Sequence, residues 1–224
     1  MNMENNRILL NCDLGEWEAP EITAQLISKV DLANIACGGH AGTEESIRNC
    51  IKLCKDYDTL PGLHPGIPGQ KGREERQLKT ETFKLLLEDQ YQTFIKFCSR
   101  PNHIKLHGAL YHLSEADPAI RNAYLQFVEK KSLNCICLAE GKVAKALGER
   151  ALHEAFLDRN YLANGSLVPR SEKNALVSSV SDIERRLGTN TIQSVDGRKL
   201  TPKIDTFCIH SDSAVTQTWF SSSH

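Results

Sequence analysis

Short apolar runs alternate with longer amphipathic segments along most of the chain. Their length is typical of strands that are buried in a parallel sheet. The runs occupy residues 7–12, 32–36, 59–63, 103–106, 134–138, 152–156 and 206–210. Strands that alternate with helices in this way predict a parallel α/β fold of about seven strands.

The segments between these runs carry apolar residues at helical spacing, and two of them begin with clear start signals. Thr43 precedes two glutamates, which suits an N-cap followed by an acidic first turn. Asp117 precedes Pro118, a residue that favours the first helical position. We therefore expect helices over residues 22–30, 44–54, 80–98, 118–128, 140–147 and 181–187.

The connections between these elements favour a barrel. Residues 12–16 (CDLGE) do not match the GxGxxG fingerprint of a dinucleotide-binding sheet, so a barrel is preferred over a doubly wound sheet. The Pro/Gly-rich residues 61–72 are too few to separate domains, and Asp196-Gly197 indicates a hairpin turn within residues 192–204. We expect residues 1–224 to form a single (β/α) barrel domain, a size that such barrels reach.

Charge and composition exclude several classes of function. The 27 Lys and Arg residues nearly balance 28 Asp and Glu residues, so the net charge of −1 gives no reason to bind nucleic acid or anionic lipid. No apolar stretch is long enough for a membrane span, and the polar N-terminal segment lacks the apolar core of a signal peptide. We expect a cytoplasmic protein whose cysteines, such as Cys50, Cys54, Cys135 and Cys137, are small buried hydrophobic residues.

Polar side chains recur directly after the apolar runs. In a parallel barrel all strands end on one face, where active sites lie, so these residues are expected to converge. They are Asp13, Glu16, His40, His64, Lys105, His107, Asp158, Arg159, His210 and Asp212. Each piece alone has a structural explanation, as a turn or an ion pair, but the repetition favours a functional site. His103, His112, His153 and His224 lack this placement, and we expect them to be structural or on the surface.

The residue types at this face fit two kinds of chemistry. One Asp with several His suits a divalent metal such as zinc, manganese, iron or magnesium, which polarises a carbonyl or activates a water. The same groups without metal suit general acid and base catalysis near neutral pH. The sequence does not choose between them. It contains no HExxH, GxSxG or GxxxxGK[ST] motif, so any use of ATP needs a different phosphate site or a partner protein.

The same segments, taken in order, resemble the LamB/YcsF family, which includes the A subunit of bacterial 5-oxoprolinase. The similarity runs from residue 9 to residue 212. The matching pieces are Leu10-Asn11-Cys12-Asp13-Leu14-Gly15-Glu16, Ala33-Asn34-Ile35-Ala36-Cys37-Gly38, His40-Ala41-Gly42, His64-Pro65-Gly66, Lys105, His107-Gly108-Ala109-Leu110-Tyr111, Asp158-Arg159, Gly165-Ser166-Leu167, Pro169-Arg170-Ser171, His210 and Asp212.

The resemblance implies a distorted seven-stranded TIM-like barrel of the glycoside hydrolase and deacetylase type. It also implies ATP-dependent opening of the 5-oxoproline lactam to L-glutamate, together with B and C subunits. By this resemblance the catalytic residues are Asp13, Glu16, His40, His64 and His107, and the candidate metal ligands are Asp13, His40, His64 and His107. The implied substrate-binding residues are Lys105, Asp158, Arg159, Arg170, His210 and Asp212.

Two further expectations concern length. The loop after His64 is shorter than in the family, and the chain ends soon after Asp212, so we expect the family's final helix to be nearly absent. Two other functions stay open: a metal-dependent deacetylase that acts alone on a sugar or other N-acyl group, and a non-catalytic binding subunit. The oligomeric state also stays open, a homo-oligomer included.

Overall fold

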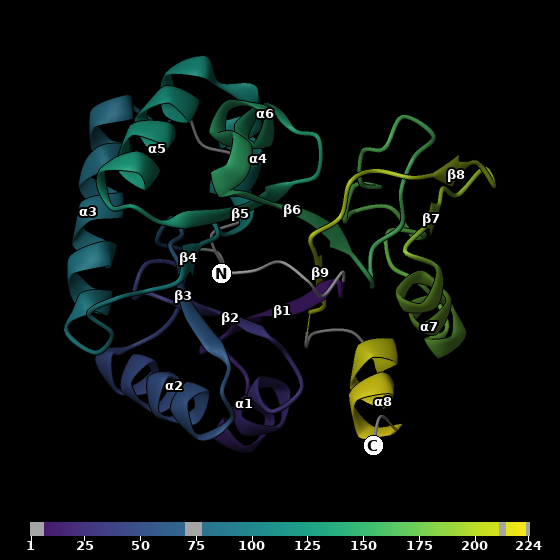
Figure 1. The fold of residues 1–224 in the computed structure, drawn as a ribbon, viewed down its shortest axis with the longest axis horizontal. Coiled ribbons are helices and arrows are strands. Elements are labelled where there is room, and N and C mark those ends of the chain that lie inside the picture. Colours follow the sequence, from purple (N-terminus) through teal and green to yellow (C-terminus); the bar gives the residue numbers. More distant parts are fainter. Residues whose placement is uncertain (1–6, 70–77, 211–213, 223–224) are drawn as a thin grey trace.

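Seven parallel strands close into a barrel at the centre of the molecule (Figure 1). The computed structural model describes residues 7–69, 78–210 and 214–222. The strands are β1 (Leu9–Leu14), β2 (Leu32–Ala36), β3 (Leu60–His64), β4 (His103–Ile104), β5 (Asn134–Leu138), β6 (Ala151–Phe156) and β9 (Thr206–Cys208). They follow one another around the barrel in this order, and β9 closes it by pairing with both β6 and β1.

All seven predicted strands are confirmed, and β2 and β5 have the predicted bounds. The others shift by one or two residues at their ends, as is usual for strand boundaries. The shift matters at β1, because it places Asp13 inside the strand and not after it. At β4 only two residues remain in the strand, so Lys105 already lies beyond it. Short strands such as β4 and β9 make the barrel irregular.

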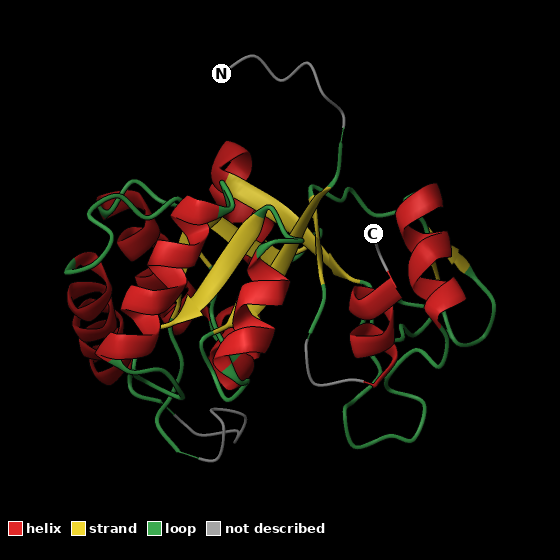
Figure 2. Cartoon of the chain, turned by 90° about the horizontal axis from the view of Figure 1, so that it is seen from below, coloured by secondary structure: helices red, strands yellow, loops and turns green. Residues whose placement is uncertain are grey.

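Helices cover the outside of the strands (Figure 2). They are α1 (Pro20–Ile27), α2 (Glu44–Asp56), α3 (Thr80–Ile95), α4 (Gly108–Ala116), α5 (Pro118–Lys130), α6 (Lys142–Leu147), α7 (Val180–Thr189) and α8 (Ala214–Ser222), with a 3-10 turn at Gly148–Arg150. Both predicted start signals act as caps. Thr43 and Ser46 form a reciprocal capping box on α2, and the Asp117 carboxylate accepts hydrogen bonds from the first turn of α5.

The predicted hairpin is also confirmed. Strand β7 (Ile192–Gln193) pairs with β8 (Lys199–Leu200) in antiparallel fashion, with the Asp196-Gly197 turn between them. This hairpin and α7 lie on the right of Figure 1, away from the helices that cover β2 to β5. The segment between β6 and α7 lies beside them and reaches the carboxyl end of the barrel.

One helix was not predicted, and one prediction about the helices is wrong. Helix α4 begins at Gly108, in a segment for which we predicted no helix. The final helix is present as α8, because Trp219 and Phe220 bury their rings and the Thr216 hydroxyl donates to the His210 carbonyl at 2.6 Å. The shortened loop after His64 largely falls on residues 70–77, outside the described residues, as do Asp212 and His224.

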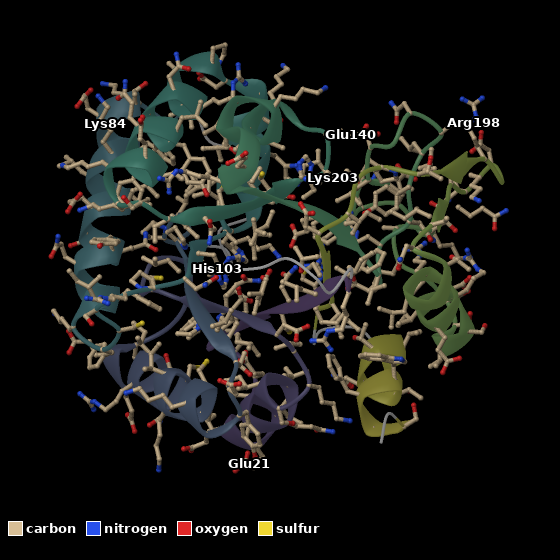
Figure 3. The ribbon with its side chains drawn as sticks, in the orientation of Figure 1. Glu21, Lys84, His103, Glu140, Arg198 and Lys203 are labelled. Atoms are coloured by element: carbon tan, nitrogen blue, oxygen red, sulfur yellow. The ribbon has the colours of Figure 1, made fainter. Side chains whose placement is uncertain are left out.

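The barrel interior holds polar side chains, whereas the layer between strands and helices is apolar. Asn11, Asn34, His103, Glu154 and Thr206 are fully buried. Figure 3 shows His103 among the strands, while Lys84, Glu21 and Arg198 lie at the periphery. All eight cysteines are free thiols, and the four that we expected in the core are buried. Within the described residues, no helix has both the length and the apolar character that crossing a membrane requires.

Candidate active site

A cavity of about 270 Å³ opens at the carboxyl end of the barrel. Most of the residues that follow the strands meet there or directly beneath it, as the sequence predicts. The polar residues of its lining are Asp13, Glu16, Lys105, His107, His112, Arg159, Arg170 and His210. Leu106, Phe156, Leu167 and Val168 contribute apolar surface.

One carboxylate oxygen of Glu16 lies at the centre of three histidines. Glu16 Oε1 is 2.8 Å from His40 Nε2, 3.0 Å from His107 Nδ1 and 3.6 Å from His64 Nε2. His64 Nε2 and His107 Nδ1 are 2.9 Å apart, and the rings of His40 and His107 stack with centroids 3.6 Å apart. We call Glu16, His40, His64 and His107 the histidine cluster.

The histidine cluster fits a divalent metal ion. Its four ligand atoms all lie within 4.8 Å of one another, and the three histidines are buried. Three imidazoles and one carboxylate are donors that zinc and related ions prefer. The Nδ1 of His64 is 2.9 Å from the Lys105 carbonyl, a contact that directs its Nε2 at the cluster.

The electrostatics of the cluster agree with this fit. Burial lowers the pKa of His40 to about 4, despite its hydrogen bond to Glu16, so the ring is neutral near pH 7 and can donate a lone pair. Burial alone would raise the pKa of the Glu16 carboxyl, but hydrogen bonds to His107 and His40 hold it well below its usual range. The cluster therefore combines neutral imidazole with an ionised carboxylate, the forms that bind metals.

Asp13 lies beside the histidine cluster and faces it with one oxygen. Its Oδ2 is 3.3 Å from His64 Nε2, while its Oδ1 accepts hydrogen bonds from Lys105 Nζ and Asn34 Nδ2, both at 2.9 Å. Burial would raise the pKa of Asp13, but His64 and Lys105 hold it well below its usual range. Asp13 is thus an ionised carboxylate that is fixed on the cavity wall.

Lys105 is surrounded by protein acceptors. Its ammonium lies 2.9 Å from Asp13 Oδ1 and 2.8 Å from Glu154 Oε1, and its side chain is 3% exposed. Burial would lower the pKa of Lys105, but Asp13 and the other neighbours hold it well above its usual value. The sequence did not identify Glu154 as part of the site. The only signal was an acidic residue inside the apolar run of β6.

Asp158 and His210 form a second pair at the cavity. His210 Nδ1 is 2.8 Å from Asp158 Oδ2, and its Nε2 is 3.7 Å from Asp13 Oδ2. The His210 ring lies parallel to that of Phe156. Burial would lower the pKa of His210, but the buried Asp158 carboxylate raises it above its usual value. The pair therefore places a proton-carrying ring beside Asp13 Oδ2, the same oxygen that faces His64 of the histidine cluster.

The two predicted arginines are placed differently. Arg159 is buried, and its Nη2 donates to the Val168 carbonyl at 2.7 Å, so it holds the segment between β6 and α7 against the cavity. Arg170 is exposed and contributes to the cavity lining. His112 is exposed, in line with the expected surface position, and it also lines the cavity.

Gln90 of α3 supports the loops that carry His40 and His64. Its amide bonds both backbone groups of Gly66, accepting from the N–H at 3.1 Å and donating to the carbonyl at 2.9 Å. A Cβ on Gly66 would overlap the His40 ring, and one on Gly39 would come within 2.5 Å of the Gln90 amide. The signal in the sequence was a polar residue on the apolar face of a helix, between Leu87 and Phe94.

Two other residues contribute from outside the predicted set. His103 Nε2 is 2.9 Å from Asn34 Oδ1, and Asn34 in turn donates to Asp13. His103 thus has a structural role, because it holds Asn34 in this chain of hydrogen bonds. Burial lowers the pKa of His103 to about 3. Trp17, which is about half exposed, packs edge-on against His40 and His107 and covers the cluster on one side.

Comparison with known proteins agrees with this architecture. The model of the LamB/YcsF family matches residues 8–221. The chain is 35% identical to the 5-oxoprolinase A subunit of Staphylococcus haemolyticus, over an alignment that covers 93% of this chain and 90% of that protein. It is 33% identical to the 5-oxoprolinase A subunit of Staphylococcus aureus (strain JH9), with 92% and 90% covered.

A solved structure shows the same fold. The crystal structure of a lactam utilization protein from Thermus thermophilus superimposes with a TM-score of 0.85 at 27% sequence identity, covering 96% of this chain and 94% of that chain. The fold is thus a TIM-like α/β barrel of seven strands. With a family model that matches almost its whole length, the chain belongs to the LamB/YcsF family.

Proposed function

We propose that this chain is the A subunit of a 5-oxoprolinase, which opens the lactam ring of 5-oxoproline by hydrolysis to give L-glutamate. The observation that carries the proposal is that Asp13 contacts both the histidine cluster and the Asp158–His210 pair at the wall of one cavity. The names of the Staphylococcus relatives and of the Thermus protein support a lactam as the substrate. A cavity of about 270 Å³ suits a small cyclic amide, since pockets for drug-sized ligands are about 300–1,000 Å³.

We assign a divalent metal to the histidine cluster, held by Glu16, His40, His64 and His107. The imidazole-rich donor set favours zinc over magnesium. When bound, such an ion polarises an amide carbonyl or lowers the pKa of a water molecule. Asp13, named as a ligand by the resemblance, is here the adjacent carboxylate, because its Oδ1 is engaged by Lys105 and Asn34.

The residues of the chain supply the proton transfers of the reaction. In the proposed step Asp13 takes a proton from the attacking water, whose oxygen forms a bond to the lactam carbonyl carbon. His210 carries a proton on Nε2 and gives it to the lactam nitrogen as the carbon–nitrogen bond breaks. The products are the carboxyl and amino groups of glutamate, and Asp13 and His210 exchange protons with solvent before the next turnover. Acid and base groups of this kind contribute about 10²–10⁴-fold each.

The proposal also includes ATP as a co-substrate and B and C subunits as partners. A lactam is a resonance-stabilised amide, and phosphorylation of its oxygen by ATP, with release of ADP, would activate the carbonyl for attack. After the ring has opened, a second water would release the phosphoryl group as inorganic phosphate and leave the carboxyl group of glutamate. The chain has no P-loop motif, so we assign nucleotide use to the assembly of this chain with B and C subunits.

The test is turnover of the assembled complex. The chain is mixed with B and C subunits, ATP and 5-oxoproline, and L-glutamate formation is measured for the wild type, His64→Ala and His107→Ala. Both variants should lose activity by at least about 10²-fold, because each removes a proposed metal ligand. His153→Ala, which changes a histidine outside the cavity, should keep wild-type turnover.

Three results would contradict the proposal. Unchanged turnover in His64→Ala and His107→Ala would remove both residues from the mechanism. Deacetylation of an N-acyl sugar by this chain alone, without ATP, would identify a metal-dependent deacetylase instead. Tight ligand binding without turnover, even with B and C present, would identify a non-catalytic subunit.

A further inference from the structure

The ammonium of Lys105 lies inside a shell of acceptors that resembles the ligand shell of a metal ion. Its Nζ is 2.9 Å from Asp13 Oδ1, 2.8 Å from Glu154 Oε1, 3.3 Å from Asn11 Oδ1 and 3.0 Å from Cys208 Sγ. Asn11, Glu154 and Cys208 are fully buried. An ammonium has three donors, and four acceptors surround this one, so no donor is left over for a substrate carboxylate.

Two of the acceptors around Lys105, Asp13 and Cys208, also belong to a group of metal-ligand type. Their ligand atoms and that of His210 lie within 4.8 Å of one another, and carboxylate, thiolate and imidazole are all zinc ligands. Glu154 adds a second carboxylate to the same shell. Without Lys105 this group would be a second metal-type cluster beside the histidine cluster.

Asp13 connects the two groups. Its Oδ1 contacts the Lys105 ammonium, and its Oδ2 lies 3.3 Å from His64 Nε2 of the histidine cluster. The two ions of a two-metal site lie about 3.5–4 Å apart, a separation that the two oxygens of one carboxylate can span. Lys105 therefore occupies the position that the second ion of such a centre would take.

The charges support the same interpretation. Asp13 and Glu154 place two carboxylates in a buried space, where ionised groups need a cation close by. Lys105 supplies one positive charge, and burial raises the pKa of Cys208 well above its usual value, so the neighbouring sulfur stays a neutral thiol. A divalent ion in the same place would balance both carboxylates.

We propose that Lys105 is a built-in second cation of the catalytic centre, so that the chain binds one metal ion and not two. This inference rests on the metal site proposed for the histidine cluster. It replaces the substrate-binding role first expected for Lys105 with a positioning role: the ammonium keeps Asp13 ionised and leaves its Oδ2 facing the cavity. Unlike a second metal ion, this cation cannot be removed by a chelator.

The test counts cobalt(II) ions bound to the full chain by spectroscopic titration and elemental analysis. The wild type should bind one ion at saturation and show no sulfur-to-cobalt charge-transfer absorption. Lys105→Ala should bind two ions and gain that absorption, because Cys208 becomes a ligand. The double variant Lys105→Ala with Cys208→Ser should lack the absorption, and Lys84→Ala, which removes a peripheral lysine (Figure 3), should behave as the wild type.

Each outcome has a defined meaning. Two ions in the wild type overturn the inference without any variant, and so does a folded Lys105→Ala protein that still binds only one. If Lys105→Ala folds only when cobalt is present and then holds two ions, the metal has replaced the ammonium, as expected. No ion in the wild type contradicts the metal site of the proposed function itself, which separates that failure from a failure of this inference.

Discussion

At the scale of single residues, Glu16 and Asp13, both expected to be catalytic, have different contacts in the site. Glu16 reaches the three histidines with one oxygen, whereas Asp13 is shared between Lys105 and His64. Both carboxyls have pKa values held well below the usual range, so both are ionised at neutral pH. The roles proposed for them, metal ligand for Glu16 and adjacent base for Asp13, therefore rest on their contacts and not on a difference in charge.

The Asp158–His210 pair gives a prediction about pH. Because the Asp158 carboxylate raises the pKa of His210, Asp158→Asn should lower it, and the protonated ring should be lost at a lower pH. If His210 donates a proton to the leaving nitrogen, the alkaline limb of the kcat/KM profile should move to lower pH. The profile of the assembled complex and the NMR titration of His210 check this together. An alkaline limb that stays in place while the His210 titration moves would rule out His210 as the acid.

At the scale of elements, helix α3 holds two loops of the barrel through one side chain. The Gln90 amide pairs with the backbone of Gly66, whose Cα faces the His40 ring. A side chain at Gly39 would collide with the Gly66 carbonyl and the Gln90 amide. The loops after β2 and β3 thus reach the site as one supported unit. Gln90 does not line the cavity, but it holds two of the loops that surround it.

Removal of this support should weaken metal binding. Gln90→Met keeps the length of the side chain but loses both hydrogen bonds, which leaves the buried groups of Gly66 without their partner and costs about 1–3 kcal/mol of folding free energy. Affinity for cobalt(II) should fall about 10–100-fold, as for other residues that orient metal ligands. Isothermal titration measures the affinity, and Gln92→Met on the exposed side of α3 is the matched control. Equal affinity in both variants would show that Gln90 does not orient the cluster.

The elements also show which parts of the fold and of the candidate site could be predicted from the sequence. Apolar runs located all seven strands, and residue types at their ends located most of the site, because parallel strands end on one face. Helix α4 was missed because it begins at Gly108 with a positive φ, directly after His107, and no side chain caps it. Glu154 and Gln90 were missed because each is one polar residue within an apolar pattern, and only the fold shows what it contacts.

At the scale of the whole molecule, the barrel has an apolar outer layer and a polar interior that leads to the cavity. Asn11 donates to Thr206 and accepts from Asn34, which accepts from His103, so four strands are linked inside the barrel. Most buried polar groups in proteins are hydrogen-bonded, and here the chain of bonds ends on Asp13. The interior thus stabilises the barrel and holds the site in one geometry.

A metal that binds the folded chain should stabilise the whole molecule. At a free concentration of about 100 times Kd, the ion should add about 2.7 kcal/mol to the free energy of unfolding, provided that the unfolded chain does not bind it. Thermal unfolding with a chelator and with zinc or manganese measures this shift. Glu16→Ala should show little or no shift with the same metals. A wild-type Tm that is the same with chelator and with metal would contradict a metal site in the histidine cluster.

The most direct measurement of the central claim is the rate of L-glutamate formation from 5-oxoproline by this chain, assembled with B and C subunits in the presence of ATP. The wild type should form glutamate at a rate that a chelator abolishes and that zinc or manganese restores, whereas Glu16→Ala should stay inactive with either metal. Undiminished glutamate formation by Glu16→Ala, or no glutamate from the metal-loaded wild-type complex, would contradict the account.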